Sequence, residues 1–159
     1  LPFDLEVLAQ ELGDECFLML RTHYLDAYKL TEEHRTFAAD LSKHHDVTEL
    51  MLLADVLVTD YSSVMFDFAN TGRPMVFYTY DYEEYVRDER GTYFDLAEQA
   101  PGPMVADTAG LVAALRDVDA LHERNRERYA AFRARYGEYE TGSAAEHVVE
   151  RFLAKGRDR

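Results

Sequence analysis

Short, unbroken apolar runs are the feature of this sequence that most constrains its fold. Four of them, at residues 16–20, 56–59, 75–78 and 104–106, are separated by segments with helical spacing or polar character. A strand that is covered on both faces is apolar along its length, whereas a strand with one wet face alternates between apolar and polar residues. The pattern therefore predicts an α/β fold in which a parallel sheet lies between two layers of helices.

Helix signals occupy the intervals between these runs. Asp46 and Glu49 have the spacing of a capping box, and Gly13 and Gly72 stand where helices are expected to end. Helices are predicted at residues 4–12, 46–54, 62–70, 81–88, 107–116, 119–136 and 143–155, and a short edge strand at residues 37–39. The length of 159 residues suits one unit, so residues 1–159 are predicted to form a single domain.

Composition limits the partners and the compartment. The 31 acidic and 17 basic residues give a formal charge of −14, which argues against a broad nucleic-acid surface but allows a local cationic pocket. Cys16 is the only cysteine and is expected in the core. Because no intrachain disulfide is possible, the sequence favours a reducing compartment. No apolar run reaches the roughly 18 residues of a membrane-spanning helix.

Polar residues follow two of the predicted strands, at the ends where ligands of parallel α/β folds bind. Ser62 and Ser63 come shortly after residues 56–59 and begin a helix. Backbone N–H groups at a helix start lack intrahelical partners, and serine hydroxyls add donors, so this turn is a candidate phosphate site. A serine that only caps the helix is the competing interpretation. Asp67, one turn further on, is either an acceptor for ligand hydroxyls or an exposed helix residue.

The other strand end carries Arg21, Thr22 and His23. Arg21 could bind phosphate through a charge-assisted fork, and His23 could act as a hydrogen-bond donor or general acid. A surface histidine beside an unrelated arginine explains the same residues equally well.

Other ligand signatures are missing from the sequence. Neither GxxxxGK[ST] nor GxGxxG occurs, so ATP hydrolysis and dinucleotide binding lack support, and no serine has the GxSxG context of a hydrolase. His44 and His45 are adjacent and so point apart on a regular element. With no second ligand pair at metal spacing, no metal site is predicted.

The motifs around the second strand resemble a known family. The run from Asp46 to Ala69, which contains Thr59-Asp60-Tyr61-Ser62-Ser63, is similar to the CDP-glycerol glycerophosphotransferases of teichoic acid synthesis. The similarity extends over further motifs along most of the chain: Leu20-Arg21-Thr22-His23-Tyr24, Arg73-Pro74, Tyr80-Asp81, Tyr85, Arg90-Gly91, Tyr93-Phe94-Asp95, Pro101-Gly102-Pro103 and, more loosely, Gly142-Ser143-Ala144-Ala145. The combination is specific, whereas no single motif is.

The resemblance implies a GT-B transferase, with two Rossmann-like three-layer halves and the active site between them. This chain resembles the C-terminal, donor-binding half, and its start at Leu1 rather than Met leads us to expect a piece of a longer protein or a processed product. Carried over by motif, the donor site consists of Arg21, Thr22, His23, Ser62, Ser63 and Asp67. The first three would line the pyrophosphate and glycerol, with His23 as a phosphate-stabilising or acid residue. The serines would hold phosphate, and the aspartate would complete the site.

The implied reaction moves glycerol phosphate from CDP-glycerol to a lipid-linked teichoic acid acceptor and releases CMP, with no cofactor. The general base would be a histidine of the N-terminal half, so this chain alone is expected to bind the donor without turnover. The acceptor implies a cytoplasmic protein with peripheral contact at the inner face of the cell membrane.

Two alternatives to this function remain. The first is the C-terminal half of a GT-B glycosyltransferase that uses a nucleotide sugar. The second is a non-catalytic α/β interaction domain in which the serines only cap a helix. Within the leading interpretation, the sequence does not separate glycerol from other polyol donors, or a primer from a polymerase.

Overall fold

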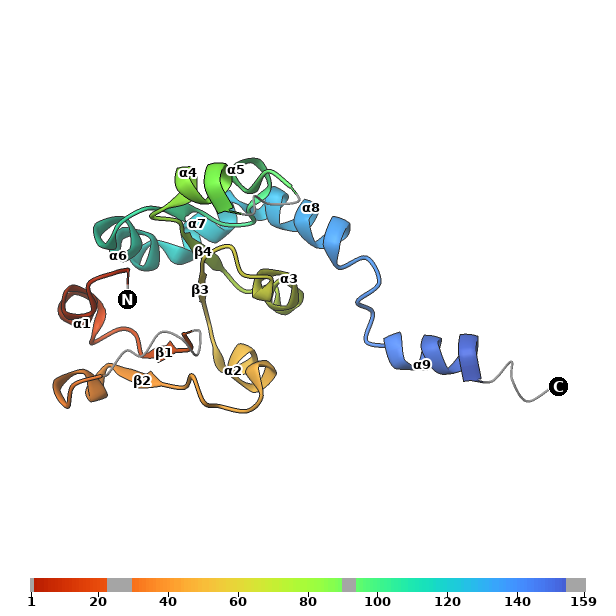
Figure 1. The fold of residues 1–159 in the computed structure, drawn as a ribbon, viewed down its shortest axis with the longest axis horizontal. Coiled ribbons are helices and arrows are strands. Elements are labelled where there is room, and N and C mark those ends of the chain that lie inside the picture. Colours follow the sequence, from red (N-terminus) through yellow and green to blue (C-terminus); the bar gives the residue numbers. More distant parts are fainter. Residues whose placement is uncertain (1, 23–29, 90–93, 154–159) are drawn as a thin grey trace.

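The computed structural model describes residues 2–22, 30–89 and 94–153 and consists of short strands and helices, with helices on both sides of β4 (Met75–Tyr78) (Figure 1). The strands are β1 (Leu18–Leu20), β2 (Ala38–Asp40), β3 (Leu57–Thr59), β4 (Met75–Tyr78) and β5 (Met104–Val105). The α-helices are α1 (Leu5–Leu12), α2 (Val47–Leu53), α3 (Val64–Phe68), α4 (Tyr82–Glu84), α5 (Leu96–Gln99), α6 (Thr108–Arg116), α7 (Val118–Arg124), α8 (Arg126–Tyr136) and α9 (Ala144–Val148). Turns of 3₁₀-helix occur at Glu33–Thr36 and Ala69–Thr71, and π-helical turns at Tyr85–Glu89 and Val149–Leu153.

The described strands pair in parallel and form two sheets. In one sheet β1 pairs with β2, with Leu18 opposite Ala38. In the other, β4 lies between β3 and β5, so that Phe77 is opposite Thr59 on one side and Met104 on the other. Parallel neighbours need a crossover connection, and α3 provides it between β3 and β4. The predicted α/β class is confirmed, with the parallel pairing divided between two sheets.

Strand β4 separates two hydrophobic cores. Val76 and Tyr78 belong to the core that includes α1 and α6, whereas Met75 and Phe77 belong to the core that includes α3, α5 and α8. Figure 1 shows α1 and α6 to one side of β4 and α3 to the other. All four strand residues are buried. Helices on both faces therefore explain why this part of the sequence is apolar without alternation.

Strand β1 is shorter than the apolar run that predicted it. Pairing with β2 begins at Leu18, so Cys16 and Phe17 precede the strand. Cys16 is exposed, and the prediction that it packs in the core is wrong. The partner strand β2 offers only three residues for pairing, which limits β1 to the same length.

The long helix predicted at residues 119–136 is two helices that meet at Asn125. This residue has φ −95° and ψ 6°, outside the helical region, and it ends α7 and begins α8. Its side-chain Nδ2 donates to the carbonyl oxygen of Leu121 at 2.8 Å. Asparagine side chains compete in this way for backbone groups, which gives the chain a local alternative to a continuous helix.

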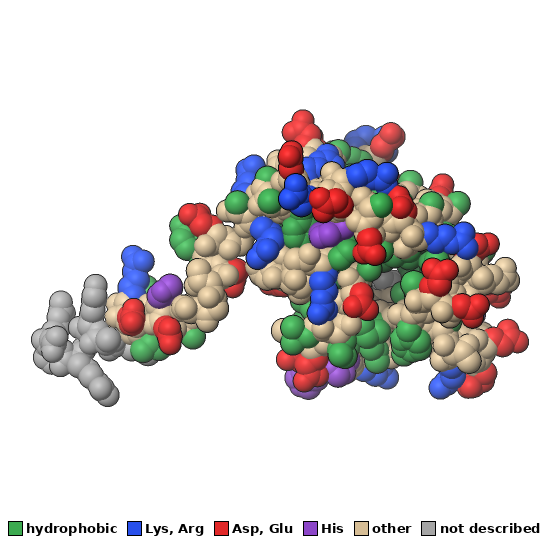
Figure 2. Space-filling model, turned by 180° about the vertical axis from the view of Figure 1, so that it is seen from behind, with side chains coloured by type: hydrophobic (Ala, Val, Ile, Leu, Met, Phe, Trp, Pro, Cys, Tyr) green, Lys and Arg blue, Asp and Glu red, His purple; other side chains and the backbone are tan. Residues whose placement is uncertain are grey.

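The C-terminal arm, residues 138–153, extends away from both cores (Figure 1). It contains α9, and the apolar side chains of Val148 and Phe152 are exposed on it. Figure 2 shows the arm projecting from a body on which acidic and basic side chains are interspersed. Among the described helices, none has both the length and the apolar character needed to span a bilayer.

Arg73 fixes the end of α2, the helix that leads into β3. Its Nη1 donates to the carbonyl oxygens of Leu52 at 2.8 Å and Ala54 at 2.7 Å. These carbonyls lack intrahelical partners because they end the helix. We expect Arg73→Met, which keeps an apolar stem, to lower the free energy of unfolding by about 2 kcal/mol, as for lost hydrogen bonds to a charged group. Urea denaturation measures this change.

Arg126→Met is the matched control for Arg73→Met. Arg126 forms an exposed ion pair with Glu123 at 3.2 Å, and such pairs contribute less than about 1 kcal/mol. Equal losses for the two variants would contradict the capping role of Arg73.

Candidate functional site

The segment after β3 forms a tight turn at the C-terminal end of the strand. Thr59, the last strand residue, is buried. The Oδ1 atom of Asp60 accepts a hydrogen bond from the backbone N–H of Ser62 at 2.9 Å. An aspartate that bonds its own backbone two residues on makes an Asx turn, which redirects the chain sharply. Residues 60–63 are called the serine turn below.

The two serines of this turn are exposed and are not engaged as ordinary helix caps. Ser63 occupies the N-cap position of α3, but its side chain makes no capping hydrogen bond. The Oγ of Ser62 accepts from the backbone N–H of Val64 at the long distance of 3.4 Å. Asp67 is also exposed, on the α-helix that the turn begins. The predicted strand-to-helix turn is therefore present, with its serine hydroxyls directed to the surface.

Tyr61 links the serine turn to the segment that follows β4. Its hydroxyl donates to Oδ1 of Asp81 at 2.8 Å. Its ring stacks on Tyr85, with 3.8 Å between centroids and 12° between planes. Burial, reinforced by the hydrogen bond to Asp81, raises the pKa of Tyr61 far above its ordinary value. The hydroxyl therefore remains protonated and acts as a donor throughout the physiological range.

The Tyr61–Asp81 contact was not predicted from the residue pattern. The two residues are 20 positions apart and follow different strands. The only signal for them in the sequence is that both belong to motifs of the family resemblance.

The segment after β1 carries the other predicted site residues. Nη1 of Arg21 donates to the carbonyl oxygens of His44 at 2.7 Å and Leu41 at 3.4 Å. The backbone N–H of Thr22 donates to Oγ of Ser42 at 3.1 Å. Arg21 and Thr22 thus hold the loop that leads from β2 to α2. His23 lies outside the described residues.

The loop held by Arg21 contains the adjacent histidines. Nε2 of His44 lies 2.8 Å from Oε2 of Glu49, across the start of α2. In the described part of the chain, no group of three or more His, Cys, Asp or Glu residues is placed to hold a metal ion. His44 therefore forms a partly exposed pair with the carboxylate of Glu49.

The structure brings the predicted residues together in two sets. Ser62, Ser63 and Asp67 belong to the serine turn and α3, after β3. Arg21 and Thr22 follow β1, which is in the other sheet. Arg21 and Thr22 directly follow β1, Ser62 and Ser63 lie in the turn after β3, and Asp67 lies further on, within α3.

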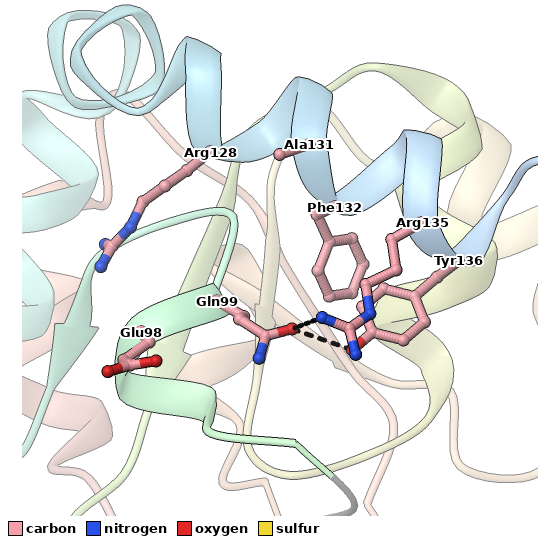
Figure 3. Close-up of a pocket in the computed structure, with 7 residues that line it drawn as sticks. All are labelled: Glu98, Gln99, Arg128, Ala131, Phe132, Arg135 and Tyr136. Atoms are coloured by element: carbon pink, nitrogen blue, oxygen red, sulfur yellow. Dashed lines mark hydrogen bonds between the residues drawn. The ribbon is translucent and has the colours of Figure 1, made fainter.

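A hollow of about 160 Å³ lies between α5 and α8 (Figure 3). Oε1 of Gln99 accepts hydrogen bonds from Nη1 of Arg135 at 3.1 Å and from the hydroxyl of Tyr136 at 3.0 Å. The guanidinium of Arg135 also lies over the Tyr136 ring, 5.3 Å from its centroid. These contacts tie the two helices together, and the lining residues include none of the predicted site residues.

Comparison with known proteins identifies close relatives. Residues 1–154 match the family model described as CDP-Glycerol:Poly(glycerophosphate) glycerophosphotransferase. The chain is 38% identical over 148 residues to a teichoic acid glycerol-phosphate transferase of Staphylococcus aureus, covering 93% of this chain and 38% of that protein. It is 40% identical over 150 residues to a teichoic acid poly(glycerol phosphate) polymerase of Bacillus subtilis, covering 94% of this chain and 20% of that protein.

A solved structure has the same fold. It is a histidine-to-asparagine variant of the wall teichoic acid polymerase TagF soaked with CDPG, and it superposes with a TM-score of 0.86 at 38% identity. The match covers 94% of this chain and 38% of that chain. The chain thus spans well under half the length of the relatives it matches.

Proposed function

Because the chain belongs to the CDP-glycerol:poly(glycerophosphate) glycerophosphotransferase family, we propose that it is the donor-binding half of a GT-B transferase. Its ligand is CDP-glycerol, and the complete protein moves glycerol phosphate to a teichoic acid acceptor and releases CMP. The chain spans only 38% of one such relative, and the remaining part of the active site belongs to the preceding half. Residues 1–159 alone are expected to bind the donor without turnover.

The observation that carries this proposal is the exposed serine turn beyond β3. Ser63 has a hydroxyl that makes no capping bond, and Ser62 makes only the long one. Helix α3 has five residues, so its dipole is small, and the hydroxyls are the stronger donors for an anion. Two exposed hydroxyls beyond the carboxyl end of a parallel strand suit the phosphate oxygens of a nucleotide.

The proposed reaction is a displacement at the β-phosphorus of CDP-glycerol. An acceptor hydroxyl oxygen forms the new P–O bond, its proton passes to the general base of the preceding half, and the bond to the CMP phosphate breaks. Negative charge grows on the bridging oxygen and on the leaving CMP. Hydrogen-bond donors fixed beside these oxygens lower the barrier, and Ser62 and Ser63 are the donors assigned to this role.

The residues after β1 are assigned to the remainder of the donor. Arg21 carries the positive charge suited to the pyrophosphate, and its contacts with the 41–44 loop fix the direction of its guanidinium. Thr22 and His23 are assigned to the pyrophosphate and glycerol, with His23 as phosphate stabiliser or acid. Asp67 is assigned to ligand hydroxyls near the start of α3.

The lipid-linked acceptor places the complete protein at the inner face of the cell membrane. Helix α8, the most arginine-rich segment, directs Tyr129 and Phe132 into the core, where both are buried. The apolar side of α8 is thus covered by the domain itself. If α8 contacts the membrane, it does so through its charged face; otherwise another part of the protein makes the contact.

We expect CMP and CDP-glycerol to raise the melting temperature of residues 1–159 and UDP-sugars to leave it unchanged. At a ligand concentration about 100 times Kd, binding contributes roughly 2.7 kcal/mol of stability. Ser62→Ala and Ser63→Ala are each expected to weaken CMP binding about tenfold, because each removes a donor to a charged oxygen. Thermal shift gives the ranking of ligands, and isothermal titration gives Kd.

Ser143→Ala is the matched control for the serine variants. Ser143 also occupies a helix N-cap and also makes no side-chain capping bond, but it lies on the C-terminal arm. CMP binding is expected to be unchanged in this variant. Absence of any shift with CMP and CDP-glycerol at millimolar concentration would reject donor binding, and an equal shift with UDP-sugars would favour a glycosyltransferase.

A further inference from the structure

The serine turn is fixed by contacts other than helix capping. Because the Ser63 side chain makes no capping bond and that of Ser62 only a long one, the start of α3 does little to hold the two hydroxyls in place. Inside the turn, Asp60 holds the Ser62 N–H at 2.9 Å. A second contact joins the side chain of Tyr61 to Asp81, a residue outside the turn.

Tyr61, Asp81 and Tyr85 form a closed set of contacts, called here the tyrosine brace. The Tyr61 hydroxyl donates to Oδ1 of Asp81 at 2.8 Å, and the Tyr61 ring stacks on Tyr85 at 3.8 Å. The backbone N–H of Tyr85 in turn donates to the carbonyl oxygen of Asp81 at 2.9 Å. The segment after β3 is thereby joined to the segment after β4, its neighbour in the sheet.

The chemistry of the brace suits a rigid link. A hydroxyl bonded to a carboxylate forms a charge-assisted hydrogen bond, roughly twice as strong as one between neutral groups. The ring stack adds an aromatic contact with little freedom to rotate. Tyr61 immediately precedes Ser62, so a shift of its side chain moves the backbone that carries both serines.

We propose that Tyr61 and Asp81 are positioning residues for the donor phosphate, because their hydrogen bond sets the direction in which Ser62 and Ser63 present their hydroxyls. The identity of the ligand rests on the function proposed above. The mechanical part, that the brace holds the serine turn, stands on the described contacts alone. The two parts are tested by separate measurements on the same variants of residues 1–159.

Hydrogen exchange followed by NMR tests the mechanical part without ligand. The informative amides are those of Met65, bonded to the Ser62 carbonyl at 3.3 Å, and Phe66, bonded to the Ser63 carbonyl at 3.0 Å. Tyr61→Phe keeps the ring and removes the hydroxyl. We expect exchange at these two amides to become about tenfold faster, with exchange in β4 unchanged.

Isothermal titration with CMP tests the effect on binding. Tyr61→Phe and Asp81→Ala are each expected to raise the Kd for CMP about tenfold. Asp81→Asn keeps an oxygen that accepts from the Tyr61 hydroxyl, and its Kd is expected to stay within about threefold of the wild type. This rescue separates positioning from charge, because Asp81→Asn removes the negative charge as completely as Asp81→Ala does.

Tyr136→Phe is the matched control for Tyr61→Phe. It also removes a tyrosine hydroxyl that donates a hydrogen bond, at 3.0 Å to Gln99, but far along the chain on α8. Neither the turn amides nor CMP binding is expected to change in this variant.

The outcomes separate the positioning role from the proposed function. Wild-type protein that does not bind CMP rejects the proposed function, and the exchange data then still decide whether the brace holds the turn. CMP binding that is unchanged in Tyr61→Phe overturns the positioning role, as does Asp81→Asn behaving like Asp81→Ala. Unchanged exchange at Met65 and Phe66 in Tyr61→Phe overturns the brace itself.

Discussion

Replacing Gly102 by alanine is expected to lower the free energy of unfolding by about 3 kcal/mol, at the upper end of the usual cost of overpacking. A Cβ atom at this position would lie 1.9 Å from the carbonyl oxygen of Met75 and 2.8 Å from its carbonyl carbon. These are backbone atoms at the start of β4, and they cannot rotate away. Pro101 and Pro103 flank the glycine and restrict the backbone on both sides, so it has little freedom to withdraw.

The effect should reach the sheet, because β4 and β5 pair beside this glycine. The N–H of Phe77 donates to the carbonyl oxygen of Pro103 at 2.8 Å. Urea denaturation of Gly102→Ala measures the loss. Gly110→Ala is its control. Gly110 lies within helix α6, and a Cβ there would lie 3.2 Å from a side-chain oxygen of the N-cap residue Asp107, which is a milder contact than one with the backbone. The helical preference of alanine offsets that contact, and we expect a change within about 1 kcal/mol. Similar urea midpoints for Gly102→Ala and Gly110→Ala would contradict the clash expected between a Cβ at residue 102 and the Met75 backbone.

Phe77→Ala is expected to lower the free energy of unfolding by about 3–5 kcal/mol. The Phe77 side chain is 0% exposed on the middle strand of the β3–β4–β5 sheet, in the core shared with α3, α5 and α8. Truncation would leave a cavity that rigid strands on both sides cannot fill. The measurement is chemical denaturation with fluorescence or circular dichroism detection.

Phe17→Ala is the matched control for Phe77→Ala. Phe17 is 58% exposed and precedes β1, so the same truncation there should change stability by no more than about 0.5 kcal/mol. If Phe77→Ala lost no more stability than this control, the assignment of Phe77 to a core would be wrong.

The elements predicted best from the sequence are those set by neighbouring residues. Asp46 is the N-cap of α2, as predicted, although it accepts from the Thr48 N–H and the Glu49 carboxylate contacts His44 at 2.8 Å. Gly72 ends the segment after α3 with φ 73°, a conformation that favours glycine. The run at residues 75–78 is β4 without a shift at either end.

The elements predicted poorly depend on residues distant in sequence. The start of β1 is decided by the length of β2, and the break at Asn125 by a side-chain bond that periodicity does not register. In the site, the strand-to-helix turn at Ser62 was predicted from local pattern. The Tyr61–Asp81 contact was not, because it exists only once β3 and β4 lie side by side. Local sequence thus indicated the serine turn as a candidate binding position, whereas the residue that contacts it, Asp81, is identified only by the fold.

The alternation of side chains along β4 also determines how the domain gains and loses its structure. Each face of β4 contributes side chains to one of the two cores. Loss of β4 therefore disrupts both cores, and we expect them to unfold as one cooperative unit. The partners of β4 are distant in sequence, with Val58 opposite Val76 and Tyr78 opposite Val105. Folding therefore requires the closure of loops before the apolar contacts form, as in other mixed α/β domains, which fold more slowly than helical bundles. The serine turn then forms late, since it and the segment that carries Asp81 both follow strands of this sheet.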